Sequence, residues 1–417
     1  MSNFLRPTLY KDPVFPYDFK NWTINNIWLH KQPLALWLIA CSLKLFGIHA
    51  WAVRVPSVIA STIGIKLIYD IAKQLYNRQV AFIAAFLFSI HGFIMELASG
   101  RTASDHIDVV FLFFIITAVW LAVKYLQRQT IIYTLLIGCS LGAALLTKWL
   151  PALIVLPVYT LLMFFNKERL GKISFNVLII FCAAMVVFLP WQWYILHTYP
   201  TEAVWEYATN SRHFYQAIEG HSGSWLYHFG QLRFLYSQLV YIPIAWFTYH
   251  TYINRNKTGL VICTWFWIPY LFFSLSATKM PAYTLIASPA IFIITAVTFY
   301  QFKAYYSTKT TPLYRWLVIG IAYALLLLPV CNTLEALKPF ETSEKDIAYM
   351  QTIHRIINSG INNDSTIVLN SSHPIEIMFY TNCLAYQYQQ DTTAIRALQQ
   401  QGYHFYFVAD DNIKKWH

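Results

Sequence analysis

Short clusters of charged and polar residues interrupt an otherwise strongly apolar sequence, and these clusters are where chemistry could occur. Ionisable side chains beside hydrocarbon are costly, so they are usually retained for catalysis, binding or pairing. The residues of interest in these clusters are His30, Lys31, Arg101, Asp105, Lys148, His221, Lys279 and Tyr283. Each of them must be weighed against a purely structural role.

Two of the lysines stand where a lipid phosphate could be bound. Lys31 comes just before Pro33, and a proline in the first turn of a helix directs the preceding side chains along the membrane surface. Lys148 lies in the tight turn LTKWLP between two apolar runs. A lysine at either place could donate charged hydrogen bonds to phosphate, or could simply anchor the helix at the membrane edge.

The segment between the second and third apolar runs carries an acid and a base. Ser104 could cap the following helix, and Asp105 near its amino end would be stabilised by the helix dipole. Alternatively, Asp105 and Arg101 lie at the mouth of a cavity, where the carboxylate could accept a proton or hold a metal ion.

Histidines and aromatic residues gather in a long connection between apolar runs. His213, His221 and His228 could bind a divalent metal such as zinc, magnesium or manganese, but their spacing matches no zinc motif. Trp225 and Tyr227 could belong to an interfacial aromatic belt or could provide a platform for a sugar ring.

These clusters must be positioned by membrane helices. Of the 417 residues, 57% are hydrophobic and only 12% are charged, which excludes an ordinary soluble protein. We predict an all-α polytopic membrane protein with about ten transmembrane helices. The predicted spans are 50–72, 80–97, 108–126, 131–146, 150–165, 173–196, 234–252, 260–275, 282–302 and 316–334.

The distribution of basic residues predicts which loops face the cytoplasm. One alternating set of loops carries twelve basic residues, and the other set carries three, Arg101, Lys148 and Lys279. Because basic loops remain inside, the polar clusters are predicted to face outward across a plasma membrane, the inner membrane of a bacterium. The net charge of +11 is largely explained in this way, and a nucleic-acid partner is not indicated.

The two ends of the chain differ from the middle. Residues 1–49 are predicted to form an outer arm, with an interfacial helix over 34–46, and residues 335–417 are predicted to form a small soluble α/β domain. The arm is basic and follows no apolar leader, so we expect a further helix upstream of Met1. The alternative is that the first span translocates the arm.

In order along the chain, these clusters resemble the motifs of the GT-C membrane glycosyltransferases, and specifically the protein O-mannosyltransferase and lipid A aminoarabinose transferase superfamily. The segment HKQPLALWLIACSLKLFG resembles "KPPL...KLFG", and AVRVPSVIAS resembles "RLPS". Further along, RTASD resembles "R..TD", LLTKWLP resembles "TKGP", FLPW resembles "PW" and SLSATKMPAY resembles "S..K.P.Y". The likeness extends from about residue 21 to residue 283.

The resemblance implies that a sugar is transferred from a polyprenyl-phosphate donor to a lipid, glycan or protein acceptor on the outer face. It implies that Lys31 and Lys148 contact the donor phosphate, that Asp105 is the acid after the second span, and that Lys279 and Tyr283 line the donor cavity. It also implies a metal near His221 in the long connection, with His30 standing where relatives often have an acidic ligand.

The chain departs from the family at two places. The family's general base follows its first helix, but no acidic pair precedes His30 here, and Ala282 stands where relatives have a histidine. The resemblance, like the topology, therefore leads us to expect a first helix and a catalytic carboxylate upstream of Met1, and an inactive protein if they are truly lacking. The alternatives are a transporter of lipid-linked sugars and a non-catalytic lipid-binding protein.

Overall fold

The computed structural model describes residues 6–10, 13–21, 25–101, 107–218, 220–306, 312–338, 344–387, 391–409 and 412–415. Asp105 therefore lies outside the described residues. The chain divides into two compact units, each considered by itself. The first unit consists of Met1–Leu29, Leu43–Ala52 and Pro339–His417, and the second consists of His30–Ser42 and Val53–Lys338.

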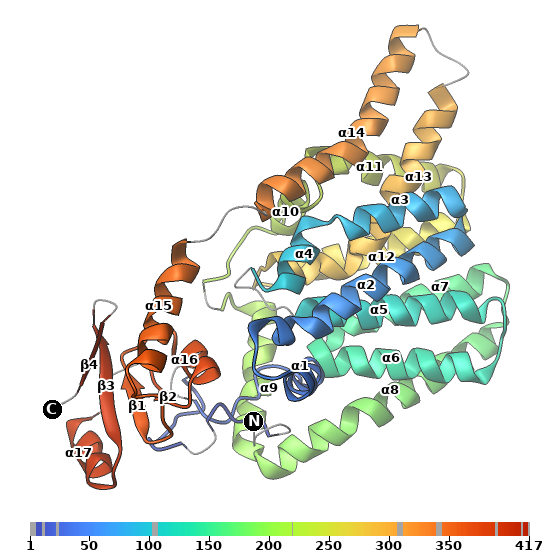
Figure 1. The fold of residues 1–417 in the computed structure, drawn as a ribbon. Helices are drawn as coiled ribbons and strands as arrows, with labels where there is room; N and C mark the ends of the chain where they lie inside the picture. The colour runs from blue at the N-terminus through green and yellow to red at the C-terminus, as the bar shows by residue number, and fades with distance from the viewer. Residues whose placement is uncertain are drawn as a thin grey trace. The chain divides into compact units, whose positions relative to one another are not determined.

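The second unit is a helical bundle (Figure 1). The helices of its first half are α1 (Pro33–Phe46), α2 (Ala50–Leu75), α3 (Arg78–Ser89), α4 (Gly92–Ser99), α5 (Ile107–Tyr125), α6 (Ile131–Lys148), η1 (Leu150–Ile154), α7 (Val155–Phe165) and α8 (Leu170–Thr198). The later helices are α9 (Pro200–Tyr215), α10 (Tyr227–Leu235), η2 (Gln238–Val240), α11 (Tyr241–Ile253), α12 (Lys257–Leu275), η3 (Pro281–Ala287), α13 (Ser288–Tyr306) and α14 (Pro312–Leu337).

The prediction of an all-α polytopic fold is confirmed, although not every predicted span is one long helix. Among the described residues, seven helices are long and apolar enough to cross a membrane. The predicted span 80–97 is a pair of helices, α3 and α4, with a bend of 48° between them. The bend occurs where the side chain of His91 accepts a hydrogen bond from the backbone of Ile94 and starts α4 anew. The predicted spans 150–165 and 234–252 begin with 3₁₀ turns and contain only short helices.

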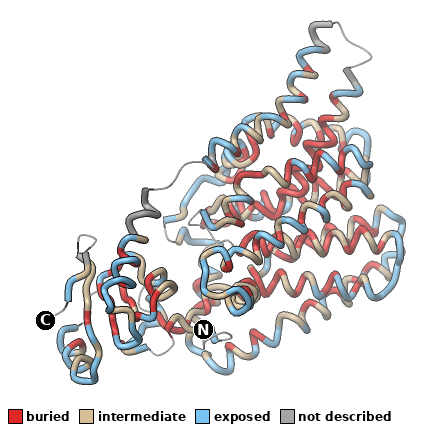
Figure 2. Tube along the Cα trace, viewed as in Figure 1, coloured by how far each residue is buried: buried red, intermediate tan, exposed pale blue. Residues whose placement is uncertain are grey.

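The core of the bundle lies along its central helices, as Figure 2 shows. The best membrane window is 94% buried for the Pro281–Ala304 segment but only 22% buried for α8. Helix α8 packs against α6 at two glycines, Gly138 and Gly142. A Cβ atom on Gly142 would lie only 2.7 Å from the backbone oxygen of Ala184, so the two helices approach too closely for any larger residue.

The turns of the bundle form two ends. Figure 1 shows that the α2–α3, α5–α6 and α7–α8 turns lie together, and we call this the basic end because of residues such as Lys73, Arg128 and Arg169. The opposite end holds the start of α5, the end of α6 and the segments around α9 and α10. We call it the site end.

The first unit contains the small α/β fold that was predicted for the tail. Its helices are α15 (Glu344–Asn358), α16 (Pro374–Tyr380) and α17 (Thr392–Gln400), and its strands are β1 (Thr366–Leu369), β2 (Leu384–Ala385), β3 (His404–Ala409) and β4 (Asn412–Lys415). The sheet order is β2-β1-β3-β4, with β1 parallel to both neighbours and β4 antiparallel to β3. Strand β4 was not predicted.

The amino-terminal arm is part of this unit, which the sequence did not indicate. The ring of Tyr10 stacks on Tyr386 at 4.8 Å, and Phe15 contacts the same ring edge-on at 5.0 Å. Both arm residues belong to one hydrophobic cluster with Ile367 and Phe405 of the sheet. The arm therefore completes the core of the domain instead of forming a separate segment.

Candidate functional site

The candidate site is built from residues at the site end of the bundle. It takes Asp108 from the first turn of α5, Lys148 from the last turn of α6 and Tyr283 from η3. His228 of α10 and Lys279, in the turn after α12, lie beside them. Helix ends far apart in the sequence thus converge, which is how a membrane bundle can assemble a polar site without placing charges at its centre.

The centre of the site is an ion pair between Lys148 and Asp108. The Asp108 side chain is only 3% exposed and that of Lys148 is 21% exposed. The acid lies at the amino end of a helix and the lysine at the carboxyl end of another, so both charges are favoured by the helix dipoles. After Lys148 the chain turns sharply, because Trp149 adopts a left-handed φ of 64° and ends α6.

An aromatic wall adjoins this ion pair. The ammonium group of Lys148 lies 5.3 Å from the centroid of the Tyr283 ring, within the range of a cation–π contact. The other neighbours of Tyr283 are Phe273, at 5.0 Å between centroids, and His228, at 6.4 Å. A cation facing an aromatic ring in a buried setting could hold both an anionic group and the flat face of a sugar.

His228 is the least satisfied polar residue of this region. Its side chain is fully buried, and neither ring nitrogen has a partner at good hydrogen-bond geometry among the described residues, although the backbone of Phe273 lies close enough to raise the pKa of the ring slightly. Burial, reinforced by the nearby charge of Lys279, lowers the pKa of His228 to about 4. The imidazole is therefore neutral at ordinary pH.

Lys279 is engaged with a helix end. Its ammonium group donates to the backbone oxygens of Phe273 at 3.0 Å and Ser274 at 2.7 Å, which belong to the last turn of α12. Burial lowers the pKa of Lys279. Its backbone nitrogen donates to the backbone oxygen of His221 at 2.9 Å, so the long connection is fixed to this turn. The lysine thus has a capping role as well as the predicted contact with the donor.

A second polar group joins the start of α1 to α9. The side chain of His30 lies 3.6 Å from the carboxylate of Glu206, which is 4% exposed as a residue. Gln192 accepts from the hydroxyl of Tyr207 at 2.6 Å and donates to Gln32 at 2.9 Å. The ring of Tyr207 contacts Trp149 edge-on at 5.3 Å, so this network reaches the residue that follows Lys148.

Some of the predicted site residues lie together in the structure, and others lie elsewhere. Lys148, Lys279 and Tyr283 belong to one region, through Phe273 and His228. Arg101 donates instead to the backbone oxygen of Leu337, at the end of α14. Lys31 is half-buried in the bend before α1.

The described side chains around His30 and His221 add no third metal ligand. Among the described residues, no group of three or more histidines, cysteines, aspartates or glutamates could hold a metal ion. His30 lies against Glu206, and His221 contributes its backbone oxygen to Lys279. The possible metal at His30 and His221 therefore stays a prediction.

Two carboxylates of the site end were not among the predicted site residues. Asp108 stands three residues after Asp105, and an acid in the first turn of a helix was the available signal for it. Glu206 lies in the long connection, and its pairing with His30 is separated by 176 positions, so no local pattern could have revealed it.

Known proteins match part of the chain, including the segment that holds Asp108 and Lys148. Residues 30–194 match the family model described as dolichyl-phosphate-mannose-protein mannosyltransferase. The undecaprenyl phosphate-alpha-4-amino-4-deoxy-L-arabinose arabinosyl transferase of Pseudomonas aeruginosa strain UCBPP-PA14 is 29% identical over 61% of this chain and 47% of its own length. The protein of the same description from Pseudomonas savastanoi is 26% identical over 62% of this chain and 49% of its own. The chain thus spans about half the length of these curated relatives.

Solved structures share the fold. ArnT from Cupriavidus metallidurans in the apo state aligns with a TM-score of 0.68 at 14% identity, covering 94% of this chain and 86% of that one. The archaeal oligosaccharyltransferase AglB from Archaeoglobus fulgidus aligns with a TM-score of 0.56 at 12% identity, covering 97% and 64%. The chain is thus similar over residues 30–194 to the dolichyl-phosphate-mannose-protein mannosyltransferase family, and it shares the fold of ArnT and AglB.

Proposed function

We propose that this protein transfers a sugar from a polyprenyl-phosphate donor to an acceptor at the site end of the bundle. The observation that carries the proposal is the half-buried Lys148, held between Asp108 and the ring of Tyr283 in a chain that is similar to such transferases. ArnT from Cupriavidus metallidurans has also been solved bound to undecaprenyl phosphate, and its fold aligns with a TM-score of 0.66. Lys31 is proposed as a second phosphate contact.

Transfer of the sugar requires a positive charge beside the phosphate that leaves. As the oxygen of the acceptor hydroxyl forms a bond to the anomeric carbon and the hydroxyl loses its proton, the bond from that carbon to the phosphate oxygen breaks. Negative charge accumulates on the lipid phosphate, which leaves as a phosphomonoester able to carry the released proton. A fixed ammonium group in a water-poor setting stabilises that charge far better than water does. Lys148 is placed for this role, with Asp108 fixing its position until the phosphate arrives.

We propose that the site end faces outward. The support is the distribution of charge, because the turns of the basic end carry most of the loop lysines and arginines and such turns remain in the cytoplasm. The plasma membrane is then the place of action, and the acceptor is a lipid, glycan or protein on its outer side.

Reconstitution of the full chain with a labelled polyprenyl-phosphate sugar tests the proposal. Wild type should yield a new labelled glycoconjugate, and Lys148→Ala should lose at least about a hundredfold in turnover, the scale on which one electrostatic donor acts. Lys172→Ala at the basic end is the matched control and should retain activity.

Two outcomes would reject a transferase, and a third would reject the role of Lys148. Movement of the unchanged lipid across the vesicle would show a transporter, and binding without conversion would show a lipid-binding protein. Full turnover by Lys148→Ala would show that other residues stabilise the leaving phosphate.

A further inference from the structure

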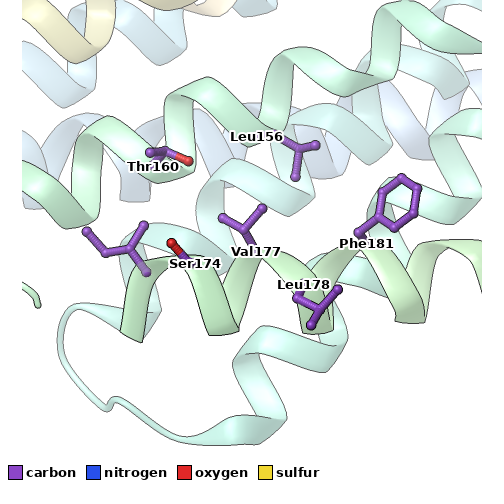
Figure 3. Close-up of a pocket in the computed structure, with 7 residues that line it drawn as sticks. Leu156, Thr160, Ser174, Val177, Leu178 and Phe181 are labelled. Carbon is purple, nitrogen blue, oxygen red and sulfur yellow. The ribbon is translucent and has the colours of Figure 1, made fainter. Parts of the chain in front are cut away.

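A groove lies between α7 and α8, and none of its lining residues belongs to the candidate site. It encloses about 450 Å³ and is lined by residues of the two helices, Leu156, Thr160, Ile173, Ser174, Val177, Leu178 and Phe181. Figure 3 shows Leu156 and Thr160 on one helix facing Val177 and Ser174 on the other. The volume is in the range of ordinary ligand sites, and most of the lining is hydrocarbon.

The two hydroxyl groups of the groove lie toward the basic end. Ser174 and Thr160 are nearer that end than Phe181 of α8 and Leu156 of α7 are, and the apolar Ile173 lies beside Ser174. Leu156 and Phe181 lie further along the same helices. From Ile173 to Phe181 the groove follows α8 for about 12 Å, at 1.5 Å per residue. This direction, from the membrane surface inward, is the one that an acyl chain takes.

Cations stand at the mouth of the groove. Lys167 and Arg169 immediately precede α8, and both side chains are exposed. Within the described structure neither has an ion-pair or hydrogen-bonding partner for its side chain. Lys172, one turn on, is already bound to Glu168 at 3.0 Å, so the two preceding residues carry the available charge.

The start of α8 adds further donors for an anion. Its N-cap residue is Arg169, which provides no capping side chain, so the first backbone N–H groups of this 29-residue helix are left for another acceptor. By contrast, α12 at the same end begins after Asn256, whose side chain accepts from Gly259 at 3.2 Å. A phosphate at the start of α8 would be bound both by N–H groups and by the two cations.

We propose that this groove binds a membrane phospholipid with an anionic head group. Its phosphate lies between Lys167, Arg169 and the start of α8, and one acyl chain occupies the groove between α7 and α8. The charge complementarity selects an anionic lipid over a neutral one, because each basic residue at the membrane surface contributes to binding such a lipid. The bound lipid would cover part of α8, whose membrane window is only 22% buried within the described structure.

The test compares two charge-removing variants of the full chain in detergent. Native mass spectrometry would count bound phosphatidylglycerol, with phosphatidylcholine of the same acyl chains as the neutral probe. Lys167→Gln with Arg169→Gln should weaken phosphatidylglycerol binding roughly 10- to 30-fold. Arg255→Gln with Lys257→Gln is the matched control, since it removes the same charge before α12, a helix with a capping side chain. The control should bind as wild type does.

A third variant tests the groove itself. Ser174→Trp places a large ring at the exposed mouth and should reduce binding of the phosphatidylglycerol probe without changing the elution volume of the protein. Equal affinity of wild type for the two lipids would overturn the head-group assignment. Unchanged phosphatidylglycerol binding in the Lys167 and Arg169 variant, or in Ser174→Trp, would overturn the site.

Discussion

Replacing Asp108 with asparagine separates the structural role of the buried ion pair from its proposed role in catalysis. The substitution keeps the size of the side chain but leaves Lys148 as a cation with 21% exposure and no carboxylate at hand. Removing one partner of a fully buried pair costs about 3–5 kcal/mol. Because Lys148 keeps some access to solvent, we expect a loss of about 2–3 kcal/mol in unfolding free energy.

The assay is thermal unfolding of the purified full chain, followed by tryptophan fluorescence. The control is Asp70→Asn, because Lys66 and Asp70 form an ion pair at 2.7 Å in which the lysine side chain is 69% exposed. Such a pair is worth only about 0.5 kcal/mol. The midpoint of Asp108→Asn should therefore fall several-fold further than that of Asp70→Asn.

A double variant shows whether burial is the cause. Asp108→Asn with Lys148→Met removes both charges and keeps nearly the same side-chain volumes, so it should recover most of the stability that Asp108→Asn loses, while transfer activity remains absent. Asp108→Asn by itself retains the lysine and should keep measurable transfer. If Asp108→Asn and Asp70→Asn shift the midpoint equally, the buried-pair reasoning is refuted.

Two further predictions concern packing and pH. Gly142→Ala in α6 should lower the free energy of unfolding by about 1–3 kcal/mol, because its Cβ meets α8. The control Gly320→Ala has open space around it and should raise the free energy of unfolding slightly. Equal shifts in the unfolding midpoint of the two variants would contradict the close contact between α6 and α8. Because His228 has a folded pKa of about 4, below the usual 6.5, its contribution to stability is complete above pH 6.5 and is lost as the pH falls to about 4, by up to about 3 kcal/mol. The midpoint measured across this range should fall less in His228→Phe than in wild type, and parallel curves would show that His228 is not buried as neutral imidazole.

Much of the architecture follows from local pattern. Long apolar runs predict membrane helices because a backbone in hydrocarbon must satisfy its own hydrogen bonds. The same logic located α5, α6, α8, α12 and α14 to within a few residues. It could not show that the run at 80–97 breaks, because the break depends on the side chain of His91, whose neighbour Gly92 donates to Thr333 at 3.0 Å, 241 positions away.

The candidate site, like the architecture, was predictable from the sequence only in part. The sequence by itself placed Lys148, Lys279 and Tyr283 at the ends of apolar runs, and the resemblance suggested a phosphate for them. It could not choose Asp108 over the neighbouring acids, nor pair it with a lysine 40 positions later. Which acid meets Lys148 depends on how α5 packs against α6, and a one-residue rotation of either helix would turn the side chain by about 100°.

The ends of the chain show the limit most clearly. Alternating patterns in the tail were enough to predict β1, β3 and helices α15 to α17. Nothing in the arm indicated that Tyr10 would stack on Tyr386, 376 positions away. Periodicity reports which face of an element is buried but not against what, because the partner is chosen by shape and by apolar surface that only the folded chain brings together. The sequence therefore determined the helices, the charged ends and the family resemblance, and only the tertiary structure decided which charges are paired and which rings enclose them.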